Sequence, residues 1–72
     1  MPKFSPGILG YGTVINGVSI ILRPFHDGFR IHANHRPCSI LPYGGYVRSI
    51  PEAQHLLKRY QPKIISFARN SK

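Results

Sequence analysis

Apolar and polar positions alternate along the first half of the chain with the period of two that is typical of β-strands. Apolar, β-forming residues occupy positions 13–15 and 18–22, on either side of Asn16 and Gly17. Asn-Gly favours a type I′ turn, because both of its residues readily take positive φ. The pattern therefore predicts a β-hairpin over residues 13–22, whose second strand ends before Pro24.

A third strand is indicated over residues 29–33. Positions 29, 31 and 33 are apolar, whereas Arg30 and His32 between them are polar. Such alternation predicts that one face of the strand is buried and that the other carries Arg30 and His32. A weaker strand is expected over residues 38–43, limited to a sheet edge by Pro42.

The second half of the chain contains one amphipathic helix. Ser49 and Glu52 form a capping-box pattern, with Pro51 in the first turn, where its missing N–H does little harm. Apolar residues then recur at i, i+3, i+4 and i+7, which indicates one buried stripe. The stripe consists of Ala53, Leu56, Leu57 and Tyr60.

The ends of the chain complete the expected organisation. Residues 1–12 are rich in glycine and proline and predict an irregular N-terminal arm. Pro62 is expected to end the helix, and the β-like residues 64–68 to add an edge strand. We therefore expect a single domain over residues 13–68 and a C-terminal tail over residues 69–72.

These elements predict an α+β fold in which a small antiparallel sheet of three to five strands packs on one α-helix in two layers. One helix can cover only one face of such a sheet. The apolar stripe and the alternating strands define an expected core of Val18, Ile20, Leu22, Phe29, Ile31, Leu56, Leu57 and Tyr60.

The charge balance is the most informative feature of the composition. Ten Lys/Arg face only two acids, Asp27 and Glu52, so that the formal net charge is +8 over 72 residues. Self-repulsion of this size destabilises a compact fold and favours an anionic partner. Phosphate backbones are the usual partner, through the release of condensed counterions. A nucleic acid, either DNA or RNA, is therefore the expected ligand.

The remaining composition predicts a cytoplasmic location. Cys38 is the single cysteine, so no disulfide can form within the chain. The longest apolar stretch, over residues 18–22, is far too short to span a bilayer, and residues 1–12 do not read as a signal peptide.

The sheet face that the helix leaves uncovered is the expected binding surface. Alternation places Arg23, Arg30 and His32 on it, with Arg36 and Arg48 at its rim. Guanidinium groups bind phosphate oxygens in pairs and read guanine edges. The predicted nucleic-acid-binding residues are these five together with two helical cations, Lys58 and Arg59.

Aromatic residues in or near glycine-containing loops form a second candidate set. Tyr11, Phe25, Tyr43 and Tyr46 could stack on unpaired bases. They could equally anchor a protein partner, because tyrosine is enriched in the most strongly contributing positions of interfaces.

The order of elements resembles that of small DNA-binding domains built from a three-stranded sheet and a helix. Three strands precede the helix start Ser49-Ile50-x-x-Ala53, and residues 18–61 match the arm-binding domain of phage integrases and the ethylene-response type. In those families the sheet enters the major groove and the helix packs behind it. The resemblance rests on folding residues, so it implies a fold and says little about chemistry. The chain lacks the tryptophan-type strand positions of these families, and no base-reading residue is transferred.

The sequence contains only weak motifs for metal binding and for catalysis. The spacing His32-x-x-His35-x-x-Cys38 matches no known zinc finger, and paired carboxylates for acid–base work are absent. We therefore predict no metal, no cofactor and no enzyme activity.

Two alternatives to nucleic-acid binding stay open. A small phage-type inhibitor or accessory subunit of a nucleic-acid-handling complex, for example an anti-CRISPR protein, would carry the same charges. A metal-independent ribonuclease could use His32 and Arg30 with Tyr43 or Tyr46.

Overall fold

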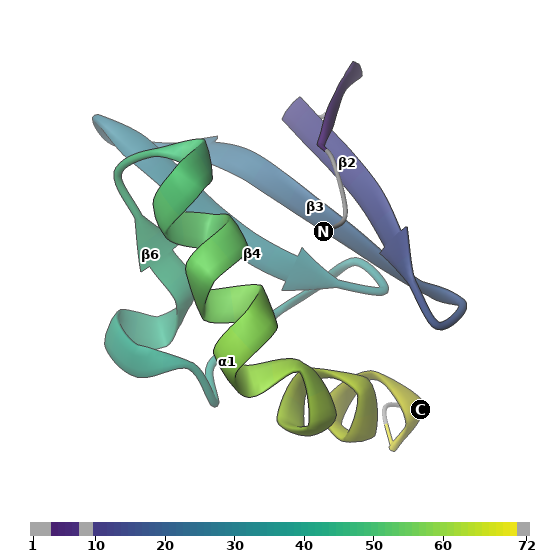
Figure 1. The fold of residues 1–72 in the computed structure, drawn as a ribbon. Helices are drawn as coiled ribbons and strands as arrows, with labels where there is room; N and C mark the ends of the chain where they lie inside the picture. The colour runs from purple at the N-terminus through teal and green to yellow at the C-terminus, as the bar shows by residue number, and fades with distance from the viewer. Residues whose placement is uncertain (1–3, 8–9, 71–72) are drawn as a thin grey trace.

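A computed structural model of the chain describes residues 4–7 and 10–70. Over these residues, a six-stranded antiparallel sheet packs on one long helix, α1 (Ile50–Arg69), which lies across one face of the sheet (Figure 1). This arrangement confirms the predicted α+β class. The strands are β1 (Ser5–Gly7), β2 (Gly10–Ile15), β3 (Val18–Phe25), β4 (Gly28–Ala33), β5 (Arg36–Pro37) and β6 (Tyr46–Val47).

The predicted hairpin is present as β2 and β3. Asn16 and Gly17 have φ angles of 49° and 80°, as a type I′ turn requires, and Ile15 pairs with Val18. The prediction that Pro24 ends the second strand is wrong, because β3 continues to Phe25. Pairing with β2 stops at Leu22, so Pro24 lies where β3 is an edge and a missing N–H is tolerated.

The expected irregular arm over residues 1–12 is partly regular. β1 pairs with β2, with Ser5 opposite Gly12, and β2 begins at Gly10. Gly10 has a φ of 128°, and a Cβ there would collide with the carbonyl oxygen of Leu22. Only glycine permits this close approach of two strands. Residues 1–3 and 8–9 of the predicted arm lie outside the described residues.

The strand predicted over residues 38–43 is wrong. After β5 the chain forms a loop and then the 3₁₀-helix η1 (Pro42–Gly45), before β6 returns to the same strand, β4. Tyr43, Gly44 and Gly45 all have positive φ, which is incompatible with an extended strand. The apolar residues of this segment instead supply Cys38 and Leu41 to the core.

The predicted start of the helix is confirmed. The Ser49 hydroxyl accepts a hydrogen bond from the Glu52 N–H at 3.3 Å. The Glu52 carboxylate in turn accepts from the Arg48 N–H at 2.7 Å, one residue before the capping-box partner. Both interactions satisfy donors at the start of α1 or next to it.

The prediction that Pro62 ends the helix is wrong, and so is the strand predicted over residues 64–68. α1 bends at Tyr60, whose φ and ψ are −111° and 19°, and then continues to Arg69 in a new direction (Figure 1). The bend accommodates Pro62 near the start of the second segment, where a helix tolerates proline. Ile64 and Ala68 are then buried one turn apart.

The core lies between α1 and the covered face of the sheet. Of the predicted core residues, Val18, Ile20, Leu22, Ile31 and Leu57 are buried, whereas Phe29, Leu56 and Tyr60 are only partly buried. Among the residues that the structure describes, eight more are buried that the expected core did not include, three of them in predicted elements (Ile15, Ala33 and Ala53) and five in segments that the sequence pattern assigned differently. The eight residues are Ile15, Ala33, Cys38, Leu41, Val47, Ala53, Ile64 and Ala68.

Candidate nucleic-acid interface

The strand register sorts side chains between the two faces of the sheet. Leu22 pairs with Ile31 and faces α1, whereas the neighbouring pair of Arg23 and Arg30 faces the opposite way. We call this opposite side the outer face. It is formed by Ile21, Arg23, Phe25, Arg30, His32 and Tyr46, since Ile21 pairs with His32 and Tyr46 with Arg30.

Two like charges lie directly opposite each other on the outer face. Arg23 of β3 and Arg30 of β4 form a cross-strand pair, and cross-strand like charges destabilise a sheet. The protein tolerates this arrangement without an acid at either neighbouring cross-strand pair. An anion bound between the two guanidinium groups would relieve the repulsion.

Arg30 is held in place from two sides. Its Nε–H donates to the Gly44 carbonyl oxygen at 3.2 Å, and its guanidinium carbon lies 5.7 Å from the centre of the Phe25 ring. The hydrogen bond uses the Nε–H and leaves the terminal NH₂ groups to face a ligand. Fixing a long side chain in advance reduces the entropy that binding must overcome.

Aromatic rings cluster at the end of the outer face next to Arg30. The Phe25 ring packs edge-on against His26 at 4.3 Å and against Tyr46 at 5.8 Å between ring centres. The Tyr46 hydroxyl donates a hydrogen bond to the Asp27 carboxylate. That bond, with a smaller effect from Arg48, lowers the pKa of Asp27, and it raises the pKa of Tyr46. Asp27 is therefore ionised at neutral pH and Tyr46 keeps its proton.

Two of the rings are open to solvent. Phe25 is 39% exposed and Tyr43, on η1, is 91% exposed. Tyr43 has a φ of 57°, so its backbone is held in the left-handed region that a tyrosine rarely adopts. Its neighbour Gly44 accepts the hydrogen bond from Arg30, so the backbone next to this exposed residue lies against Arg30.

His32 is half-buried on the outer face. Its Nδ1 lies 3.2 Å from the Arg30 carbonyl oxygen. A carbonyl only accepts, so Nδ1 carries the proton and Nε2 remains as the acceptor in the neutral ring. Burial lowers the pKa of His32, and the charges of Arg23, Arg30 and His35 lower it further. The ring is therefore neutral at pH 7 and gains its charge only in acid.

Three of the predicted cations lie on the helix side of the molecule. Arg36 pairs with Ala33, which faces α1, and its guanidinium carbon is 5.0 Å from the centre of the Phe67 ring. Lys58 and Arg59 are exposed on α1, where they line a shallow depression with His55. The structure therefore brings Arg23, Arg30 and His32 together, with Arg48 near Asp27, and places the other three predicted cations elsewhere.

Tyr11 also differs from its predicted role. It pairs with Leu22, faces α1 and packs edge-on against Phe29, with 5.8 Å between the ring centres. Its ring belongs to the margin of the core and not to the outer face. The outer-face contribution of the Gly44 carbonyl was missed, because no periodicity in the sequence marks a loop that folds back on a strand.

The described residues offer no metal centre. No group of three or more His, Cys, Asp or Glu side chains within them could hold a metal ion. Cys38 is buried, and burial raises the pKa of its thiol to about 11. The thiol is therefore neutral at pH 7, which makes it a poor nucleophile.

Comparison with protein-family models, with curated proteins and with solved structures found no match to this chain. The described residues include no helix that is both long enough and apolar enough to cross a membrane.

Proposed function

We propose that this protein binds single-stranded nucleic acid on its outer face. The observation that supports the proposal is the direct pairing of Arg23 with Arg30 on the sheet face that α1 leaves uncovered. Of the two acids in the chain, Asp27 lies at the aromatic end of that face, where it is bonded to Tyr46, and Glu52 accepts at the start of α1, so neither is paired with Arg23 or Arg30. The missing negative charge is supplied by the ligand.

The choice of an unpaired strand follows from the exposed rings. The Phe25 ring lies against Arg30, and the exposed Tyr43 is next in the chain to Gly44, to whose carbonyl oxygen Arg30 donates, so a strand bound by the arginines would have two aromatic residues within reach. Bases of a single strand stack on such rings, whereas the bases of a duplex are already stacked on one another. The ligand class is therefore a flexible strand of DNA or RNA, bound mainly through its backbone.

A salt-titrated binding assay tests this proposal. A labelled thymidine strand of about 12 nucleotides, near the site size of small single-strand binders, is titrated with protein between about 50 and 200 mM salt. Each neutralised phosphate contributes about −0.7 to the slope of log K against log salt. Contacts from Arg23, Arg30 and Arg48 predict a slope of about −2.

Two results of this assay would contradict the proposal. An affinity independent of salt would exclude phosphate contacts as the source of binding. A duplex of the same length that binds as tightly as the single strand would exclude base stacking on Phe25 and Tyr43.

Binding is expected to strengthen in acid through His32. Lowering the pH adds a proton to His32, and a bound phosphate favours the protonated ring, so affinity rises below the ordinary histidine pKa of 6.5. If the phosphate raises the pKa by one unit, the gain reaches about tenfold. Anisotropy titrations at about pH 7.5 and about pH 5.5 measure it.

The variant His32→Gln should lose a large part of this gain in affinity, while His55→Gln, on α1, should retain it. If the affinities of His32→Gln and His55→Gln depend on pH in the same way, His32 is not the group responsible for the gain in acid.

The free protein should show the opposite trend in stability. The folded state has the lower His32 pKa, so the unfolded chain binds the proton first and the free energy of unfolding falls as the pH drops below about 6.5.

A further inference from the structure

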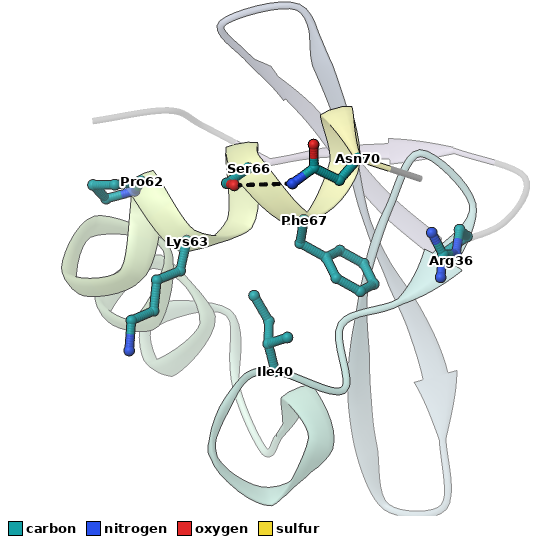
Figure 2. A pocket seen from close by; sticks show the side chains of 7 residues that line it. All are labelled: Arg36, Ile40, Pro62, Lys63, Ser66, Phe67 and Asn70. Carbon is teal, nitrogen blue, oxygen red and sulfur yellow. Dashed lines mark hydrogen bonds between the residues drawn. The ribbon is translucent and has the colours of Figure 1, made fainter. Parts of the chain in front are cut away.

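A groove of about 670 Å³ lies on the helix side of the molecule, away from the outer face. It runs between the second segment of α1 and the loop that follows β5, and Figure 2 shows the side chains that line it. The groove exists because α1 continues past Pro62 and brings Phe67 opposite Ile40.

The floor of the groove is apolar and open to solvent. Ile40 is 45% exposed, although it is a large apolar residue in a loop. Phe67 packs against the core with only part of its ring buried, and Pro62 is exposed. Exposed apolar side chains that gather in one depression on a small domain indicate a surface that another molecule covers.

Cations flank this apolar floor. Ile40 and Phe67 lie between Lys63 on one side and Arg36 on the other (Figure 2). Arg36 rests over the Phe67 ring with 5.0 Å between the guanidinium carbon and the ring centre, a contact that does not consume its N–H donors. Among the described residues that line the groove, none is acidic.

Polar groups complete the lining at the end of α1. The Asn70 amide nitrogen donates to the Ser66 hydroxyl at 3.4 Å (Figure 2). This bond orients the amide so that its carbonyl oxygen stays available as an acceptor. An extended peptide offers backbone N–H groups that such an acceptor can bind.

We propose that this groove binds a protein partner through an acidic segment that carries an apolar side chain. The apolar side chain fits between Ile40 and Phe67, and its acidic neighbours meet Arg36 and Lys63. Nucleic acid fits less well here, because Arg36 already covers one face of the Phe67 ring and a base would have only aliphatic neighbours in Ile40 and Pro62. The groove and the outer face are separate, so one chain could hold a strand and a protein together.

A pair of synthetic peptides tests the groove. The probe carries a leucine flanked by two aspartates on each side, and the control has glycine in place of the leucine at the same charge. In amide-resolved NMR titrations of the whole chain, we expect the leucine peptide to shift Ile40, Lys63 and Phe67 and to saturate. Its affinity should exceed that of the glycine peptide by about tenfold or more, since burial of a leucine accounts for that factor.

Variants from two different elements keep the test independent of folding. Lys63→Glu and Ile40→Ser should each weaken the leucine peptide about tenfold, because they remove a charge or an apolar contact. Lys58→Glu, which changes charge equally on α1 outside the groove, should retain the affinity. The double variant with Arg23→Ala and Arg30→Ala should also bind the peptide normally, which separates this proposal from the function of the outer face.

Several outcomes would overturn the proposal. They are equal binding of both peptides, amide shifts confined to the outer face, unchanged affinity in both groove variants, and displacement of the peptide by a thymidine strand that shifts the groove residues. The first three would show that the groove does not recognise an acidic, apolar segment, and the last would show that it binds nucleic acid instead.

Discussion

Replacing Arg23 and Arg30 together with alanine is expected to weaken binding of a single strand about 10- to 100-fold at low salt. The two side chains form the cross-strand pair of the outer face, and each accounts for roughly 1 kcal/mol or more as a charge-assisted contact to phosphate. The slope of log K against log salt should become shallower by about 1.4, which corresponds to two lost phosphate contacts on a single strand. The salt-titrated anisotropy assay measures both quantities.

A matched double variant separates position from charge. Lys58→Ala with Arg59→Ala removes the same two positive charges from exposed positions on α1, on the helix side of the molecule. It should change the affinity only about two- to threefold, through long-range attraction that salt screens. Equal losses in the two doubles would mean that net charge alone, and not the outer face, determines binding.

Gly28→Ala is expected to lower the free energy of unfolding by about 3 kcal/mol. A Cβ at position 28 would collide with the carbonyl oxygen of Val47 and lie 3.0 Å from the Tyr46 hydroxyl oxygen. The backbone of β6 cannot move without breaking its pairing with β4, where Val47 faces Phe29 and Tyr46 faces Arg30. Urea unfolding followed by far-UV circular dichroism measures the loss, which is a large fraction of the stability of a small domain.

Gly12→Ala is the control for this substitution. Gly12 also lies in a strand, but a Cβ there would make only an ordinary contact, 3.7 Å from the Ile20 carbonyl oxygen. Its unfolding free energy should stay within about 0.5 kcal/mol of that of the parent chain. A similar loss for the two variants would show that the close approach of β6 does not explain the effect, since replacing glycine by alanine without a collision should slightly stabilise the folded state.

The substitution at Gly28 is expected to affect the candidate interface as well as the stability of the fold. Displacement of β6 would carry Tyr46 away from Phe25 and Asp27, and these contacts order the aromatic end of the outer face. We therefore expect any folded fraction of Gly28→Ala to bind the single strand more weakly as well. No local pattern in the sequence marks this close approach, because the partner strand β6 lies almost twenty residues further along the chain.

The candidate interface was predictable to the extent that it depends on alternation. Arg23, Arg30 and His32 were placed on one face because side chains in a strand alternate between two faces whatever the rest of the fold does. Arg36 was placed wrongly at the rim of that face. Asn34 and His35 both take positive φ, and the tight turn they form pairs Arg36 with Ala33 on the side of α1.

By itself, the sequence determined the features that local chemistry decides. The Asn16-Gly17 turn, the alternation through β3 and β4 and the Ser49 cap all follow from backbone preferences and from hydrogen bonds between close neighbours. None of these depends on a distant part of the chain, so a local pattern is sufficient to predict them. The charge of the protein and the three basic side chains of the outer face follow in the same way.

Only the tertiary structure decided how the chain behaves after residue 60. Pro62 and the β-branched residues that follow it favour the end of the helix locally, yet burial of Ile64 and Ala68 against the sheet outweighs that preference at the cost of a bend at Tyr60. The return of β6 to β4 is decided in the same way, since Val47 is buried there. Burial depends on residues far apart in sequence, and for that reason the groove beside Phe67 has no signature in the sequence.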